Sequence, residues 1–462
     1  MAAPKQGKPR PRPPVADVEP LRESDLAFAL GNAASVMAAV VFDGRSLDSA
    51  LDGVLRNVQM PGVRGAIRDL SYFGLRNWGR GELAVELMSG RPTLKPTELG
   101  CLLGLGLSLI WPGQTAKYPA HTVVNEVVRA CSSRPGWVAA KGLVNACLRS
   151  FQREEAAVVA EVIRTVQGRW NLPEWWVNTV LHQHPDEGRQ LLEQTGMHAP
   201  FVLRVNQRWG TPDDYVAELE KRGVVGYVEG PSAVWLPKGM SVHDLPGFAQ
   251  GWVSVQDMAA QLAAPLMELK AGQRVLDACA APGGKTGHLL ECADIDLTAL
   301  DISAARMARV QDNVDRIAPT LGTQWRYTAK VAPAQDLTAW WDGQPFDAVL
   351  ADVPCTGSGV ARRHPDIPWL RRPQDLTQLS RLQHTLLDAL WSVVKPGGTL
   401  TLVTCSIFQE EGPLLATAFL EQHSDAQALP APGLVYPMLD DQGHVHPASP
   451  DGFFYARFSK RP

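Results

Sequence analysis

Residues 274–289 read RVLDACAAPGGKTGHL: an apolar segment runs into a glycine-rich turn, and a helix-like segment follows. In open α/β sheets, a strand, a tight turn and a helix in this order direct backbone amides at the helix start toward an anionic or carboxylate-bearing ligand. Gly283 and Gly284 carry no side chain that would keep such a ligand from the backbone. The stretch therefore predicts an α/β domain with a site for a nucleotide-type cofactor.

Two familiar phosphate-binding loops do not fit this turn. A P-loop needs a glycine where Cys279 stands, and the dinucleotide pattern GxGxxG does not match CAAPGGK. An ATPase or a dinucleotide enzyme is therefore disfavoured, and another nucleoside ligand remains. Asp301 ends the next apolar segment, LTALDIS, where a carboxylate in such sheets accepts hydrogen bonds from ribose hydroxyls.

The α/β pattern continues toward the carboxyl end of the chain. The apolar segments RVLDACA, LTALDIS, FDAVLADVP and TLTLVTCS alternate with helix-like segments, as in a parallel sheet built from βαβ units. FFYARFSK, residues 453–460, predicts a closing strand. We expect residues 252–462 to form one Rossmann-like domain.

Three further parts precede this domain. Residues 1–20, rich in proline, lysine and arginine, predict a disordered basic tail, which is either a solvated extension or an electrostatic handle for RNA. Residues 21–153 show alanine- and leucine-rich helical periodicity, which indicates an all-α domain. Residues 154–251 combine tryptophan-rich helical segments with the β-like pieces FVLRVN and AVWLP, so we expect a small α+β module.

The composition is that of an ordinary soluble protein with several domains. A net charge of −4 excludes wholesale polycationic binding, so any RNA contact must come from local basic patches. The seven cysteines form no CxxC pair or Cys/His cluster, which argues against a disulfide framework and a metal site. No apolar stretch is long enough to span a membrane and the first residues contain no secretory signal, so we expect a cytoplasmic protein.

Two of the cysteines end apolar, strand-like segments. Cys355 follows FDAVLADVP and Cys405 follows TLTLVT, and both stand in turns among polar residues. Consecutive strands of this kind are usually neighbours, and ligands bind at their carboxyl ends, so both sulfurs should face the cofactor crevice. A thiolate can add to carbon 6 of a cytosine, which makes carbon 5 able to attack an electrophilic methyl group, and a second group must then assist release.

With these residues in place, the chain resembles the RNA cytosine-5 methyltransferases that depend on S-adenosylmethionine. The resemblance rests on CAAPGGK, on the DVPC turn and on the TCS turn. GVARRHPDIPWLRRPQDL, residues 359–376, is similar to bacterial members of the RsmB type, which modify small-subunit ribosomal RNA. AHTVVNEVV (120–128) and KGLVNACLR (141–149) look like the NusB-like helical RNA-binding domain of those enzymes.

The resemblance implies a role for each site residue. Cys405 would be the nucleophile, Cys355 would help product release, and Asp352 would contact the cofactor and the target base. Asp301 would bind the ribose of the cofactor. The turn would hold the methionine end of the cofactor; its residues are Cys279, Ala280, Ala281, Pro282, Gly283, Gly284 and Lys285.

Basic and aromatic residues follow the Cys355 turn. A target cytosine must be unstacked to reach a cofactor, so phosphate clamps and a stacking surface are expected nearby, although a solvated arginine face is the alternative. The predicted RNA contacts are Arg362, Arg363, His364, Trp369, Arg371 and Arg372.

The chain departs from the family pattern at the adenine end of the cofactor. Pro333 stands where the family usually has an acidic residue, and Asp336 could replace it only if the loop is rearranged. Three other hypotheses stay open: a catalytically silent ribosomal RNA binding or assembly factor, a transfer RNA cytosine-5 methyltransferase, and a redox protein with a Cys355–Cys405 disulfide. We expect a monomer.

Overall fold

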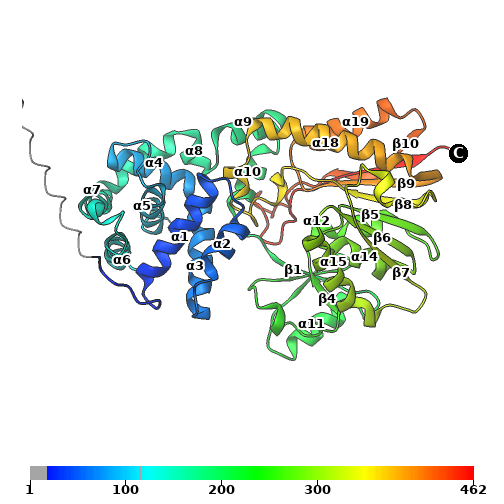
Figure 1. The fold of residues 1–462 in the computed structure, drawn as a ribbon, viewed down its shortest axis with the longest axis horizontal. Helices are drawn as coiled ribbons and strands as arrows, with labels where there is room; N and C mark the ends of the chain where they lie inside the picture. Colours follow the sequence, from blue (N-terminus) through cyan, green and yellow to red (C-terminus); the bar gives the residue numbers. More distant parts are fainter. Residues whose placement is uncertain (1–17, 114–115) are drawn as a thin grey trace, which may run out of the picture. The chain divides into compact units, whose positions relative to one another are not determined.

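The computed structural model describes residues 18–113 and 116–462 (Figure 1). The expected tail, residues 1–20, therefore lies outside the described residues up to position 17. Glu19 is held in place, because its amide donates to the carbonyl of Ser132 at 3.1 Å and its carboxylate pairs with Arg129 at 3.0 Å. Within the described ranges, no helix is both long and apolar enough to cross a membrane.

The chain divides into two compact units, and the boundary between them follows Glu174. The first unit is helical throughout its described residues, as the sequence predicts. Its helices are α1 (Leu26–Val41), α2 (Leu47–Leu55), α3 (Pro61–Arg76), α4 (Trp78–Ser89), α5 (Thr97–Leu109), α6 (Ala120–Ser132), α7 (Lys141–Arg164) and α8 (Val166–Trp170). The boundary expected after Arg153 falls inside α7, where Glu154 has non-helical backbone angles (φ −116°, ψ 16°).

The second unit begins with a small antiparallel sheet in the order β2-β3-β1-β4. Its elements are α9 (Glu174–Gln183), α10 (Gly188–Gly196), β1 (Phe201–Val205), α11 (Pro212–Glu220), β2 (Tyr227–Glu229), β3 (Ala233–Leu236) and β4 (Val253–Val255). The β-like pieces FVLRVN and AVWLP become the paired strands β1 and β3. β4 lies beyond the expected boundary at residue 251 and pairs with β1, so one strand of this sheet comes from the segment that was expected to belong to the following domain.

A seven-stranded sheet in the order β10-β11-β9-β8-β5-β6-β7 forms the rest of the unit. The strands are β5 (Arg274–Ala278), β6 (Asp296–Asp301), β7 (Arg326–Val331), β8 (Phe346–Asp352), β9 (Val394–Thr404), β10 (Ala426–Leu434) and β11 (Phe454–Lys460). The five strands from β9 to β7 are parallel, which confirms the βαβ prediction. β11 is the expected closing strand and runs antiparallel to both β9 and β10.

Helices cover both faces of this sheet. Successive strand residues point to opposite sides, so the apolar side chains of each strand pack against helices on both faces. The helices are α12 (Met258–Gln261), α13 (Ala263–Leu266), α14 (Gly284–Cys292), α15 (Ala304–Ile317), α16 (Leu337–Trp340), α17 (Ile367–Leu370), α18 (Pro373–Ser392) and α19 (Pro413–Gln422). Leu350 packs in the core beneath α14 and α15, whereas its neighbour Val349 packs beneath α18 and α19. Parallel strands covered on both sides leave the carboxyl ends of β5, β6, β8 and β9 as the place for a ligand.

Candidate active site

The two predicted thiols meet at the carboxyl ends of neighbouring strands. β8 and β9 are parallel neighbours in which Asp352 lies opposite Val403. Cys405 directly follows β9, and Cys355 follows β8 after a short turn. Their Sγ atoms are 3.3 Å apart, and both cysteines are free and partly exposed. The expected convergence of the two sulfurs is confirmed.

A cavity of about 400 Å³ lies beside these sulfurs. It gathers residues from the ends of β5, β6, β7, β8 and β9, as expected for the ligand edge of a doubly covered parallel sheet. Its lining includes Cys279, Ala281, Asp301, Ile302, Arg306, Pro333, Gln335, Asp352, Cys355, Leu386 and Cys405. The cavity therefore joins the predicted cofactor loop to both thiols.

The glycine-rich turn contributes only part of its length to this cavity. Cys279 and Ala281 line it, whereas Pro282, Gly283 and Gly284 line a second cavity of about 200 Å³. Glycine is required at 283 for another reason than ligand approach: φ is +98°, and a Cβ there would lie 2.9 Å from the Cα of Val310. That Gly283 and Gly284 let the cofactor approach the backbone stays a prediction.

The cavity has the chemistry that S-adenosylmethionine requires. Ile302, Pro333 and Leu386 give apolar walls suited to a purine ring, and Asp301 also lines the cavity. The two Asp301 carboxyl oxygens accept hydrogen bonds from the amides of Ala281, at 3.3 Å, and Ser303, at 2.9 Å. Asp301 is therefore fixed in place before any ligand arrives.

A partly buried ion pair joins Asp352, which lines the cavity, to Lys285. Lys285 Nζ lies 2.7 Å from Asp352 Oδ2. Burial opposes the ammonium charge, yet the Asp352 carboxylate raises the pKa of Lys285 above its usual value. The pKa of Cys355 is also raised, by its contact with Cys405, by burial and by the negative charge of Glu411. This part of the site thus holds a cation, a carboxylate and two thiols.

The adenine end of the cavity carries no carboxylate at the usual place. Pro333 lines the wall, and Asp336 is exposed with its Oδ1 accepting from the hydroxyl of Thr338 at 2.7 Å. Gln335 lines the cavity instead. An amide can both donate to and accept from an adenine edge, so Gln335 is the polar group available there.

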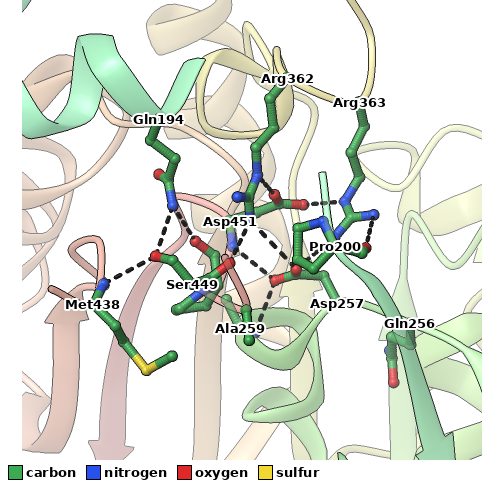
Figure 2. Close-up of polar contacts among 12 residues, drawn as sticks. Gln194, Pro200, Gln256, Asp257, Ala259, Arg362, Arg363, Met438, Ser449 and Asp451 are labelled. Carbon is green, nitrogen blue, oxygen red and sulfur yellow. Dashed lines mark hydrogen bonds and ion pairs between the residues drawn. The ribbon is translucent and has the colours of Figure 1, made fainter. Parts of the chain in front are cut away.

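Two of the predicted RNA contacts, Arg362 and Trp369, are buried; a third, Arg363, is partly exposed and ion-paired, and its contact with RNA stays a prediction. Arg362 is 1% exposed and pairs with Asp451 at 2.5 Å, while Arg363 pairs with both Asp451 and Asp257 (Figure 2). The assignment of Arg362 as a phosphate clamp is wrong, because its guanidinium is enclosed by protein carboxyl and carbonyl oxygens. Trp369 is 8% exposed, so its ring packs inward and is not the predicted stacking surface.

The remaining predicted RNA contacts lie nearer the surface. His364 and Arg372 are exposed, and Arg371 is partly exposed. The guanidinium of Arg371 donates to the carbonyls of Thr356, at 2.9 Å, and Cys355, at 3.4 Å, so it also braces the Cys355 turn. These three side chains keep their place as candidate RNA contacts.

Two carboxylates near the site were missed by the sequence analysis. Glu411 is fully buried behind the cysteine turns, and Asp277 is fully buried at the end of β5. Asp277 accepts a hydrogen bond from Thr286 Oγ1 at 2.6 Å, and burial raises the pKa of Asp277 to about 7. For Asp277 the available signal was a polar residue inside the apolar segment RVLDACA. For Glu411 there was no such signal, because two consecutive glutamates at 410–411 are typical of an exposed turn.

Comparison with known proteins gives a family and a fold. Residues 264–459 match the family described as 16S rRNA methyltransferase RsmB/F, and residues 172–243 match the ferredoxin-like domain of RsmF/B-like methyltransferases. Ribosomal RNA small subunit methyltransferase B of Vibrio cholerae is 37% identical over 453 residues, which cover 94% of this chain and 100% of that relative.

Solved structures share the arrangement of elements. The crystal structure of PH0851 covers 96% of this chain and 100% of its own, with a TM-score of 0.70 and 21% identity. A methyltransferase homolog protein from Pyrococcus horikoshii covers 64% of this chain and 97% of its own, with a TM-score of 0.52 and 23% identity. At these identities the likeness is one of fold: a helical amino-terminal region and a Rossmann-like mixed sheet.

Proposed function

Since the chain belongs to the family of 16S rRNA methyltransferases RsmB/F, which use S-adenosylmethionine, we propose that it methylates carbon 5 of one cytosine in small-subunit ribosomal RNA. The observation that carries this proposal is the pair of sulfurs, 3.3 Å apart, at the cavity that fits the cofactor. A methyltransferase acting on an oxygen or an exocyclic nitrogen needs no second thiol at the reacting centre. Cytosine carbon 5 needs both activation and release.

Each side chain has a part in the proposed reaction. The Cys405 thiolate adds to carbon 6 of the cytosine, forming a sulfur–carbon bond and placing electron density on carbon 5. Bound S-adenosylmethionine supplies an electrophilic methyl group. Asp352 orients the cytosine edge through its exocyclic amine and keeps Lys285 charged beside the thiols. After methyl transfer a base takes the proton from carbon 5, the electron pair of that C–H bond re-forms the carbon 5–carbon 6 double bond, and the Cys405 sulfur leaves carbon 6 as a thiolate, with Cys355 assisting this release.

Cofactor and RNA would occupy different sides of the same cavity. Cys279, Ala281 and Lys285 would hold the methionine end of S-adenosylmethionine, Asp301 its ribose, and Ile302 and Gln335 its adenine. His364, Arg371 and Arg372 follow the Cys355 turn and would meet the RNA backbone.

The preceding parts of the chain would supply further RNA contacts. We propose that the helical region up to about residue 153 is NusB-like and that the small antiparallel sheet serves the same substrate. The helical character is clear from α1 to α8, and the ferredoxin-like match spans residues 172–243.

Transfer of tritium from labelled S-adenosylmethionine tests the proposed substrate. We expect label in 16S ribosomal RNA lacking its own 5-methylcytosine, and bisulfite sequencing should place it at one cytosine. Unfractionated transfer RNA serves as the second substrate in parallel. Label in transfer RNA alone would contradict the ribosomal assignment, and label at an atom other than carbon 5 would contradict the chemistry.

A further inference from the structure

Glu411 lies behind the reacting centre with no role in the reaction derived above. It ends the one-turn 3₁₀ helix Gln409–Glu411, shortly after Cys405, and it is 0% exposed. A buried carboxylate costs free energy unless donors surround it. The donors around Glu411 come from both cysteine turns and from α18.

The Cys355 turn is bound to Glu411 on both sides of the cysteine. The Thr356 amide donates to the two carboxyl oxygens of Glu411, at 2.9 and 3.1 Å, and the Thr356 hydroxyl donates to Oε2 at 2.5 Å. Gln383 Nε2 donates to Oε1 at 3.2 Å and also to the carbonyl of Pro354 at 2.8 Å. Thr356, which follows Cys355, therefore bonds directly to the Glu411 carboxylate, and Pro354, which precedes Cys355, is linked to it through Gln383.

The Cys405 turn is bound to the same residue. The hydroxyl of Thr404 donates to the backbone carbonyl of Glu411 at 2.9 Å. Ser406, on the other side of Cys405, has its hydroxyl within hydrogen-bond distance of the hydroxyls of Ser358, at 2.9 Å, and Thr356, at 3.4 Å. Thr356 and Thr404 thus bond directly to Glu411, and Pro354 is linked to it through Gln383, so Glu411 connects the turns that hold the two sulfurs 3.3 Å apart.

The carboxylate is retained although it costs stability at neutral pH. Burial raises the pKa of Glu411 above its usual value, even though Ser406, Thr356 and Gln383 oppose this shift. An acid whose folded pKa is raised stabilises the fold fully below its unfolded pKa, and this contribution is lost as the pH rises through the folded pKa. A group that costs stability at the pH of function is expected at a functional centre.

The charge of Glu411 also distinguishes the two thiols. Two thiols whose sulfurs are in contact do not readily ionise together. Glu411 lies on the Cys355 side, where its negative charge disfavours a thiolate. The other charged groups at the pair are Lys285 with Asp352, and Arg371 at the carbonyl of Cys355.

We infer that Glu411 is a positioning residue that locks the two cysteine turns together and places a negative charge on the Cys355 side of the thiol pair. This inference rests on the proposed roles of the two thiols. Glu411 itself touches neither cofactor nor substrate, and it acts through Thr356, Gln383 and Thr404.

The test combines turnover with thiol reactivity in the full chain. In Glu411→Gln, the new amide NH₂ group faces hydrogen-bond donors only, which should displace the two thiols. We therefore expect turnover to fall about 100-fold while the KM for RNA stays unchanged. Loss of the negative charge should shift the pH midpoint of Cys355 alkylation by iodoacetamide, read by mass spectrometry, downward. Glu421→Gln, an exposed glutamate on α19, is the matched control and should change neither readout.

A second variant separates geometry from charge. Thr356→Val removes the hydroxyl donor and leaves the carboxylate charge, so turnover should fall about tenfold while the Cys355 alkylation midpoint stays in place. It also replaces Glu411→Gln as the test if that variant does not fold. Wild-type turnover in Thr356→Val, or an unshifted Cys355 midpoint in folded Glu411→Gln, would overturn the inference. The alkylation profile needs no RNA, so it supports or overturns the positioning role even if the carbon 5 chemistry fails.

Discussion

Asp451 should be the most sensitive carboxylate in the second unit. It is fully buried and receives the side chains of Arg362 and Arg363, and its own amide donates to Asp257 Oδ1 at 2.9 Å. Figure 2 shows how this cluster joins the loop after the Cys355 turn to the segment around Ser449, to Asp257 and to Pro200.

Removal of this carboxylate leaves a buried cation without its main partner. In Asp451→Ala, Arg362 keeps the carbonyl of Ser449 and a distant Asp257, 3.9 Å away. Breaking a buried ion pair from one side costs about 3–5 kcal/mol, so we expect a loss of that size in the free energy of unfolding of the second unit. Asp451→Asn keeps one acceptor but turns an NH₂ group toward a guanidinium, and it should cost about 2–3 kcal/mol.

The effect should reach the reacting centre through the backbone. Gly452 donates to the carbonyl of Gly359, and Gly359 donates to the carbonyl of Cys405, both at 3.0 Å. Hydrogen exchange of residues 356–363 and 449–452, together with urea unfolding, measures both consequences. Asp441→Asn, an exposed residue of the same segment, is the control. A folded Asp451→Ala protein that unfolds within about 0.5 kcal/mol of wild type, with unchanged exchange, would refute the reasoning.

Three further predictions follow from individual side chains. In wild type, the raised pKa of Asp277 favours the protonated carboxyl in the fold, so the free energy of unfolding should fall by up to about 4 kcal/mol as the pH rises from about 4 to 7. Asp277→Asn should remove this loss. Unfolding measured at pH 5 and pH 8 checks the sign, and an equal gain in stability at both pH values would contradict the prediction. Gln335→Ala should weaken S-adenosylmethionine binding about tenfold by calorimetry, whereas Asp336→Ala should leave the affinity unchanged; the reverse order would show that the loop rearranges to bring in Asp336. Gly359→Ala should cost about 3 kcal/mol and slow methyl transfer, because the new Cβ would lie 1.7 Å from the Gly452 carbonyl oxygen, while Gly142→Ala on α7 meets open space; equal thermal stability of the two variants would count against the packing at Gly359.

The sequence was sufficient for the sheet and for the meeting of the thiols, because both follow from local pattern and from the rule that consecutive parallel strands are neighbours. Cys355 and Cys405 needed only their positions at strand ends. Arg362 could not be placed this way, since its partner Asp451 is 89 residues away and a run of arginines reads equally well as an exposed face. Glu411 was missed for the same reason, because its partners belong to other segments.

Gly283 and Pro333 show a second limit of pattern reading. The sequence marked the glycine correctly as special, but its positive φ and its contact with Val310 depend on how α15 packs behind the turn. At Pro333 the sequence showed only that a usual carboxylate is missing. The position of Gln335 at the cavity depends on the loop after β7, whose course no local pattern determines.

Trapping of the protein–RNA adduct tests the central claim most directly. Cys355→Ala, incubated with S-adenosylmethionine and radiolabelled 16S ribosomal RNA, should leave a covalent complex that survives a denaturing gel, because Cys405 attacks and is not released. Cys405→Ala should bind the RNA and give neither an adduct nor methylation. An adduct with Cys405→Ala but not with Cys355→Ala would reverse the roles of the two thiols, and full methylation by Cys405→Ala would contradict covalent catalysis by this pair.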